Sequence, residues 1–167
     1  MALLLAAGCV APFSSDVRAK VDGELNFPAL FSNPEIYADK VVILGGEVIS
    51  TDPLENHTEV IMLEKPLGVD WRPKQTNARG RFILVVNTFL DPAVWKNGSD
   101  VTAIARVAGH RDGKIGRSPY SYPVVEAIEW RLWAQLPPPV HYYHYDPFWD
   151  PYCRGRRPPG SRKSIRK

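Results

Sequence analysis

The fold is decided by residues 41–49, whose sequence is VVILGGEVI. The residues on both sides of Gly45-Gly46 are apolar and mostly β-branched, which favours a strand. Glycine inside a strand usually marks a bulge or a sharp bend. A strand that bends in this way suits a small β-barrel, so we expect residues 41–49 to form its first, bent strand.

Four more strand-forming runs follow this stretch. They span residues 59–64, 80–86, 100–107 and 122–133. The first of these ends at Lys65-Pro66 because proline cannot donate to a strand ladder, and the turn-rich residues 52–56 predict a hairpin with the bent strand. Residues 80–86 are apolar on both faces and are expected in the middle of the sheet.

The last two runs carry information about the interior and the turns. The small side chains that alternate from Val101 to Val107 predict a tight interior, and Asp112-Gly113 predicts a two-residue hairpin turn because Asp-Gly accepts positive φ angles. In the final run, we expect Ile128, Trp130 and Leu132 on one face. The residues expected in solvent are Glu126, Glu129 and Arg131.

The fold class follows from these elements and one short helix. Asn33-Pro34-Glu35 predicts a helix start, since asparagine caps well, proline suits the first helical position and an acid favours the first turn. This helix should end near Asp39. Short strands at hairpin spacing with glycine kinks favour a closed barrel over a sandwich. The predicted fold is mainly β: a small antiparallel OB-like β-barrel of five to six strands, with one short N-terminal helix and an extended C-terminal tail.

The first nine residues carry a signal for location. An apolar run, Leu3-Leu4-Leu5-Ala6-Ala7-Gly8, ends in small residues and leads into Cys9. Lipoprotein signal peptidase requires this order, because small side chains enter its cleft and the cysteine thiol accepts diacylglycerol. We predict that residues 1–8 are a signal peptide, truncated before its basic region, and that Cys9 is lipidated. The alternative is an ordinary apolar N-terminal strand or helix start.

Length and composition suggest one domain with appended segments. The chain has 167 residues, of which 44% are hydrophobic, and this is enough for one sizeable core. We expect a tether at residues 9–25, the barrel domain at residues 26–136 and a disordered tail at residues 137–167. No other stretch approaches the roughly 20 apolar residues of a spanning helix, so the expected membrane link is covalent lipid or surface charge.

Charge is divided unevenly along the chain. Residues 154–167 hold seven of the 21 basic residues and no acid, which leaves 14 basic and 18 acidic residues in the rest. Such a tail is expected to bind an anionic surface, whether phospholipid, lipopolysaccharide phosphate or nucleic acid. The alternative is a solvated segment that aids solubility. The basic residues are Arg154, Arg156, Arg157, Arg162, Lys163, Arg166 and Lys167.

The chain offers few residues for catalysis or metal binding. His141 and His144 lie three residues apart, but the prolines around them disfavour a helix, and zinc needs more than two side chains. His57 and His110 lie near expected turns, and the sequence has neither a Gly-x-Ser-x-Gly elbow nor a glycine-rich phosphate loop. We therefore expect no catalytic residues, no metal, no cofactor and no enzymatic activity.

Six short motifs occur in the order found in a known family. They are Val42 to Val48 around Gly45-Gly46, Leu63 to Leu67, Gly80-Arg81-Phe82, Phe89 to Pro92, Asn97-Gly98 before Val101-Thr102, and residues 113–124. On these motifs the chain resembles the Slp family of bacterial outer-membrane lipoproteins. The resemblance implies a lipid-anchored protein of the outer membrane with its domain in the periplasm. It also implies a starvation- or stress-related role without established catalysis, and Val10 after the cysteine fits export to the outer membrane.

Two hypotheses of function remain open. The leading one is a non-enzymatic envelope lipoprotein whose partner is the membrane, through lipid on Cys9 and, at the tail, through anionic lipid or lipopolysaccharide. The alternative is an OB-like protein that binds nucleic acid or another anionic ligand with its basic tail. The acidic body and the lipid signal disfavour nucleic acid.

Overall fold

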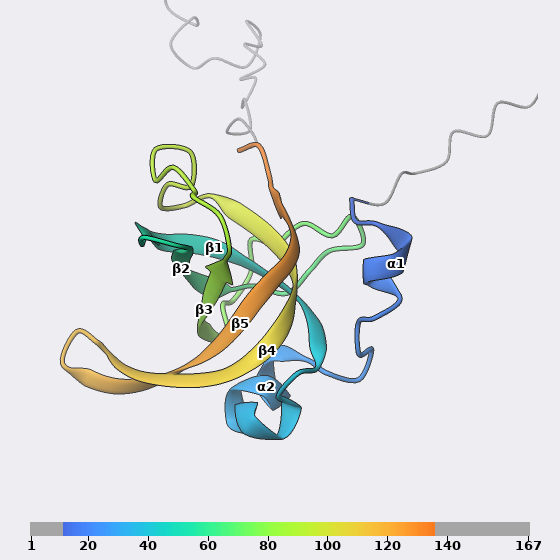
Figure 1. Ribbon diagram of the computed structural model, residues 1–167, viewed down its shortest axis with the longest axis horizontal. Coiled ribbons are helices and arrows are strands. Elements are labelled where there is room, and N and C mark those ends of the chain that lie inside the picture. Colours follow the sequence, from blue (N-terminus) through green and yellow to red (C-terminus); the bar gives the residue numbers. More distant parts are fainter. Residues whose placement is uncertain (1–11, 136–167) are drawn as a thin grey trace, which may run out of the picture. The chain divides into compact units, whose positions relative to one another are not determined.

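The computed structural model describes residues 12–135, in which five strands form one closed ring in the order β1-β2-β3-β5-β4 (Figure 1). The mainly β, OB-like barrel expected from the sequence is confirmed. The strands are β1 (Val41–Pro53), β2 (Thr58–Glu64), β3 (Gly80–Val86), β4 (Asp100–Ile115) and β5 (Ser118–Leu132).

Strand β1 has two neighbours, and the change from one to the other falls at the predicted glycines. It pairs with β4 from Val41 to Glu47 and with β2 from Gly46 onward, and its bulge lies between Val48 and Ser50. A Cβ atom at Gly45 would lie 2.3 Å from the Leu67 side chain, and one at Gly46 would lie 2.7 Å from the Leu63 carbonyl oxygen. The glycines are therefore required for close packing, and the bulge expected at them lies three residues further on.

One strand pair in the ring is parallel, which corrects the expectation of a wholly antiparallel barrel. Residues 83–85 of β3 pair in parallel with residues 124–126 of β5, and the other four pairings are antiparallel. The reason is geometric. Strand direction cannot alternate around a closed ring with an odd number of strands, so a five-stranded ring contains at least one parallel pair.

The described chain has three short helical segments, where the sequence predicted one. They are α1 (Ser15–Arg18), α2 (Phe27–Ser32) and the 3-10 helix η1 (Pro34–Tyr37), which is the predicted one. Asn26 caps α2 by accepting a hydrogen bond from the backbone N of Ala29 at 3.1 Å. Phe27 is buried and its ring lies 6.0 Å from that of Phe82, so α2 packs onto the barrel core. Within residues 12–135 no helix has the length and apolar character to cross a membrane.

Strands β4 and β5 form a long hairpin whose outer part, residues 109–123, extends beyond the ring (Figure 1). We call this part the hairpin arm. Its turn is Gly116-Arg117, where Gly116 has φ 60°, so the prediction of a turn at Asp112-Gly113 was wrong. Gly113 lies inside β4 opposite Tyr120, and a Cβ atom there would lie 3.0 Å from the Tyr122 ring. Gly113 thus provides room for an aromatic ring and not a turn.

The barrel core contains the alternating small residues of β4, as predicted. Val101, Ala103, Ala105 and Val107 are all at most 2% exposed. In β5, however, Ile128 has no partner in the ladder, because Ala127 pairs with Ala105 and Glu129 pairs with Ile104. This bulge shifts the alternation of side chains. Trp130 and Leu132 pair with Ala103 and Val101 without a further register shift, so these two lie on the same face of β5, as expected.

Candidate functional site

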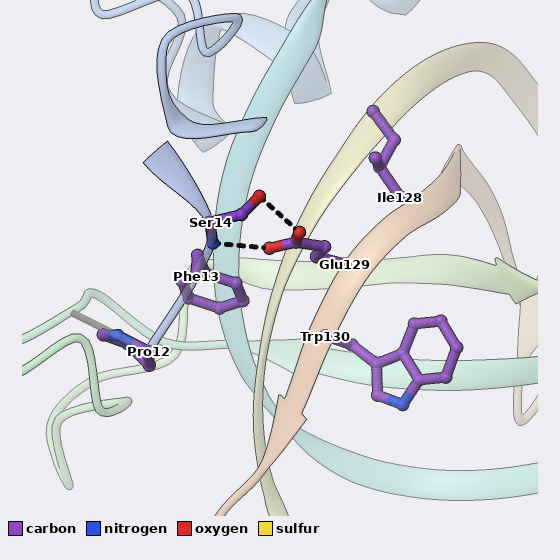
Figure 2. A pocket seen from close by; sticks show the side chains of 6 residues that line it. All are labelled: Pro12, Phe13, Ser14, Ile128, Glu129 and Trp130. Carbon is purple, nitrogen blue, oxygen red and sulfur yellow. Dashed lines mark hydrogen bonds between the residues drawn. The ribbon is translucent and has the colours of Figure 1, made fainter. Parts of the chain in front are cut away.

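The start of the described chain is seated on the barrel. Phe13 is only 5% exposed, and its ring meets that of Trp71 edge to face with centroids 6.2 Å apart. Ser14 donates from its backbone N and its Oγ to the Glu129 carboxylate at 3.0 and 2.5 Å (Figure 2). Glu129 therefore binds the N-terminal segment, whereas the sequence analysis placed it in solvent.

Within its described part, the predicted tether at residues 9–25 is attached to the barrel at several residues. Residues 15–18 form α1, Val21 forms a β-bridge with Val41, and Leu25 belongs to the core. The composition is polar and small, as in a linker, but a few apolar residues attach it to the barrel. Such isolated residues carry no periodicity, so the pattern predicted a linker.

A pocket of about 400 Å³ lies where this segment meets β5 (Figure 2). The hydrogen bonds between Ser14 and Glu129 lie at this pocket. The residues that line it are Pro12, Phe13, Ser14, Ile128, Glu129 and Trp130.

The β2–β3 loop, residues 65–79, brings Trp71 to Phe13. The Trp71 carbonyl accepts from Thr102 Oγ1 at 2.6 Å, and the same hydroxyl accepts from Trp133 Nε1 at 2.9 Å. Two guanidinium groups lie over the Trp133 ring, with Arg72 at 5.0 Å and Arg131 at 5.1 Å from its centroid. We call this set the tryptophan face. It consists of Phe13, Trp71, Arg72, Arg131 and Trp133.

Charged groups at the barrel rim hold the start of the same loop. Lys65, only 6% exposed, donates to Glu47 at 2.5 Å and to Gln75 at 3.0 Å. Gln75 in turn donates to Asp100 at 2.8 Å. Burial raises the pKa of Asp100, and the nearby Lys65 ammonium acts in the opposite direction.

The end of the loop is held by an ion pair. The Glu64 carboxylate is buried and accepts two hydrogen bonds from Arg79, one of them from Nε at 2.8 Å. This contact raises the pKa of Arg79. Each end of the loop is therefore anchored by paired charges, and the tryptophan face has a rigid base.

The residues that the sequence singled out fall mostly elsewhere. Cys9, the histidines at 141 and 144, and the seven basic residues of the tail lie outside the described residues. His57 lies 3.4 Å from Glu59, and His110 pairs with Glu35 at 2.5 Å. Within residues 12–135 no three His, Cys, Asp or Glu side chains gather in a way that would hold a metal ion.

The tryptophan face was missed by the sequence analysis. Its members lie in three separate segments, and only the tertiary structure joins them. The available signals were isolated aromatic residues, namely Phe13 in a polar stretch and Trp133 directly after β5.

Comparison with known proteins identifies the family to which the chain belongs. The profile described as "Outer membrane lipoprotein Slp family" matches residues 6–158. The uncharacterized lipoprotein YeaY of Escherichia coli K12 is 28% identical over 131 residues, which cover 78% of this chain and 67% of YeaY. The outer membrane protein Slp of the same organism is 26% identical over 136 residues, covering 80% of this chain and 71% of Slp.

A third relative matches a shorter region. An uncharacterized protein of Haemophilus influenzae is 35% identical over 97 residues, which cover 57% of this chain and about half, 52%, of that protein. No solved structure matches. These findings confirm the resemblance carried by the central motifs and the expected location. The chain belongs to the Slp family of outer membrane lipoproteins.

Proposed function

We propose that lipid on Cys9 anchors this protein in the outer membrane and that the barrel is a non-enzymatic domain on its periplasmic face, with a role in the envelope or in stress. The observation that carries the anchor is the position of Cys9. It follows an apolar run with small residues at its end, and it falls inside the region matched by a lipoprotein family. The thiol is the group that a diacylglycerol transfer requires.

The packing of the described charges supports a binding or scaffolding role. The buried Glu64 and Lys65 are each paired with a neighbour that fixes the β2–β3 loop. Groups committed to such pairs stabilise the loop, whereas a catalytic acid or base needs a proton free to exchange with a substrate. The tryptophan face is exposed, aromatic and cationic, which suits contact with a surface or a partner.

The C-terminal tail has a second role in this proposal. Its seven basic residues would bind anionic lipid or lipopolysaccharide phosphate, because each Lys or Arg near an anionic leaflet contributes about 1 kcal/mol. The tail would add to an attachment that the lipid already provides.

Mass spectrometry of the protein from isolated outer membranes tests the anchor. The chain, expressed with a complete signal peptide, should begin at Cys9 and carry the added mass of a diacylglycerol and, after N-acylation, of a further acyl chain. Cys9→Ser should abolish this mass, and a high-salt wash, which screens the basic tail, should then release the protein from the membrane fraction. Cys153→Ser is the matched control, and it should leave both unchanged. An unmodified, uncleaved chain would contradict the proposal.

A further inference from the structure

We propose that the tryptophan face lies on the bilayer, with Val69 at the depth of the lipid head groups. The inference rests on the lipidation of Cys9 proposed above. It adds an orientation: the barrel is held close to the membrane by one particular side and does not swing on a long tether.

The first step is the distance between the lipid and the barrel. Phe13 is buried against Trp71, and Ser14 is bonded to Glu129, so the chain is fixed to the barrel from residue 13 onward. Cys9 lies four residues earlier. An extended chain spans at most about 3.3–3.6 Å per residue, so the lipidated cysteine lies within about 14 Å of Phe13. The head-group layer alone takes up about 5–8 Å of this distance.

The second step is the chemistry of the surface that this short link brings to the lipid. Tryptophan favours the membrane interface, because its ring is apolar and its N–H remains hydrogen-bonded. Val69 is fully exposed at the tip of the loop that carries Trp71 and Arg72. The guanidinium groups of Arg72 and Arg131 beside Trp133 would meet lipid phosphates.

The third step is that the surface is preformed. Thr102 links the Trp71 carbonyl to the Trp133 ring, and Lys65 holds the base of the loop. At the loop tip, Asp70 accepts from the backbone N of Arg72 at 3.2 Å and closes the turn. A rigid surface loses little conformational entropy on contact, so modest burial at the interface suffices to favour it.

A pair of fluorescent probes tests the orientation on the full, lipidated chain. In a Cys153→Ser background, where lipid occupies the Cys9 sulfur, Val69→Cys and Ile36→Cys each accept an environment-sensitive label. Ile36 is 73% exposed and lies in η1, a segment that contributes no residue to the tryptophan face. Both side chains project into solvent, so neither substitution removes a core contact.

The labelled proteins are placed in vesicles of phosphatidylethanolamine and phosphatidylglycerol. The probe at residue 69 should emit at shorter wavelength and should be quenched severalfold more by nitroxide-labelled lipid than the probe at residue 36, while aqueous iodide should show the opposite order. Equal quenching at both positions would overturn the orientation. A probe at residue 69 that neither quencher reaches would also overturn the orientation, since another protein molecule would then cover the tryptophan face.

The acyl mass is measured on the same samples, which separates the two proposals. Absence of the acyl mass contradicts the lipid anchor. Presence of the acyl mass with a water-exposed probe at residue 69 contradicts only the orientation.

Discussion

Phe13 shows how one side chain can decide what a segment does. Residues 10–25 have the composition of a linker, and nothing in their periodicity predicts an attachment to the barrel. The attachment depends on one ring, which fits beside Trp71, and on one serine, which meets Glu129. Such a contact joins positions more than fifty residues apart, so it could not be predicted from local sequence.

Phe13→Ala should therefore weaken the fold and loosen the N-terminal segment. We expect the free energy of unfolding to fall by about 3 kcal/mol, at the low end for a buried phenylalanine, because the adjoining pocket is open to solvent. Urea denaturation of the lipidated chain in detergent, followed by tryptophan fluorescence, measures this change. Phe89→Ala, at a side chain that is 71% exposed, is the control and should change stability by less than about 0.5 kcal/mol. Equal effects of the two substitutions would show that the Phe13 contact is energetically unimportant.

At the scale of elements, the strands were predictable and the turns and short helices were less so. The β-branched runs and the glycine pair of β1 predicted the strands. The hairpin turn was missed because two glycine-containing dipeptides compete in the arm, and the contact of Gly113 with Tyr122 decides between them. Helices α2 and η1 both follow an asparagine and have a proline in the first turn, but only Asn26 of α2 makes the capping hydrogen bond. Six residues are too few for a helical period to show in α2.

The hairpin arm is tied to β2 by one bidentate ion pair, which has a pH dependence of known sign. Arg111 donates to both oxygens of Glu59 at 2.6 and 2.8 Å, and this contact lowers the pKa of Glu59 below 4.5. The pair therefore stabilises the fold above this pH, and its contribution is lost as the pH falls through the lowered pKa.

Arg111→Met should lower the free energy of unfolding by about 0.5–1 kcal/mol at neutral pH, a small value because the Arg111 side chain is half exposed. The difference from the wild type should shrink as the pH falls well below 4.5. Denaturation curves over a pH series measure it, with Lys114→Met on the same arm as the control. A loss of stability that does not vary with pH would mean that Arg111 acts by packing alone.

At the scale of the whole molecule, the barrel followed from the number of strands and their glycines. The family followed from motifs spread along the barrel. The tryptophan face could not be predicted from the sequence, because it forms only when the N-terminal segment, the β2–β3 loop and β5 come together. The lipid on Cys9 and the role of the tail stay predictions, since they concern residues outside the described part of the chain.

The tail proposal predicts a salt-dependent attachment that does not need the lipid. The Cys9→Ser chain should bind phosphatidylglycerol vesicles at low ionic strength and should be released as sodium chloride is raised, because screening shortens the reach of its seven positive charges. Sedimentation with vesicles measures this binding. Replacing the seven basic tail residues with glutamine should abolish the binding, and vesicles of phosphatidylcholine should not bind either chain. Undiminished binding by the glutamine variant would assign the attachment to the barrel.

Closure of the ring also protects the protein from its own copies. An unpaired strand border exposes backbone N–H and C=O groups that another chain can use to extend the sheet, which is a common route to aggregation. In the described part of the chain, the barrel strands are paired on both sides, and residues 109–123 of the hairpin arm pair only with each other. There, Pro119 and Pro123 remove two backbone donors from β5, and Lys114 and Arg117 place positive charge near the tip. Copies of the protein on one membrane surface meet often, and these residues disfavour edge-to-edge pairing of their strands.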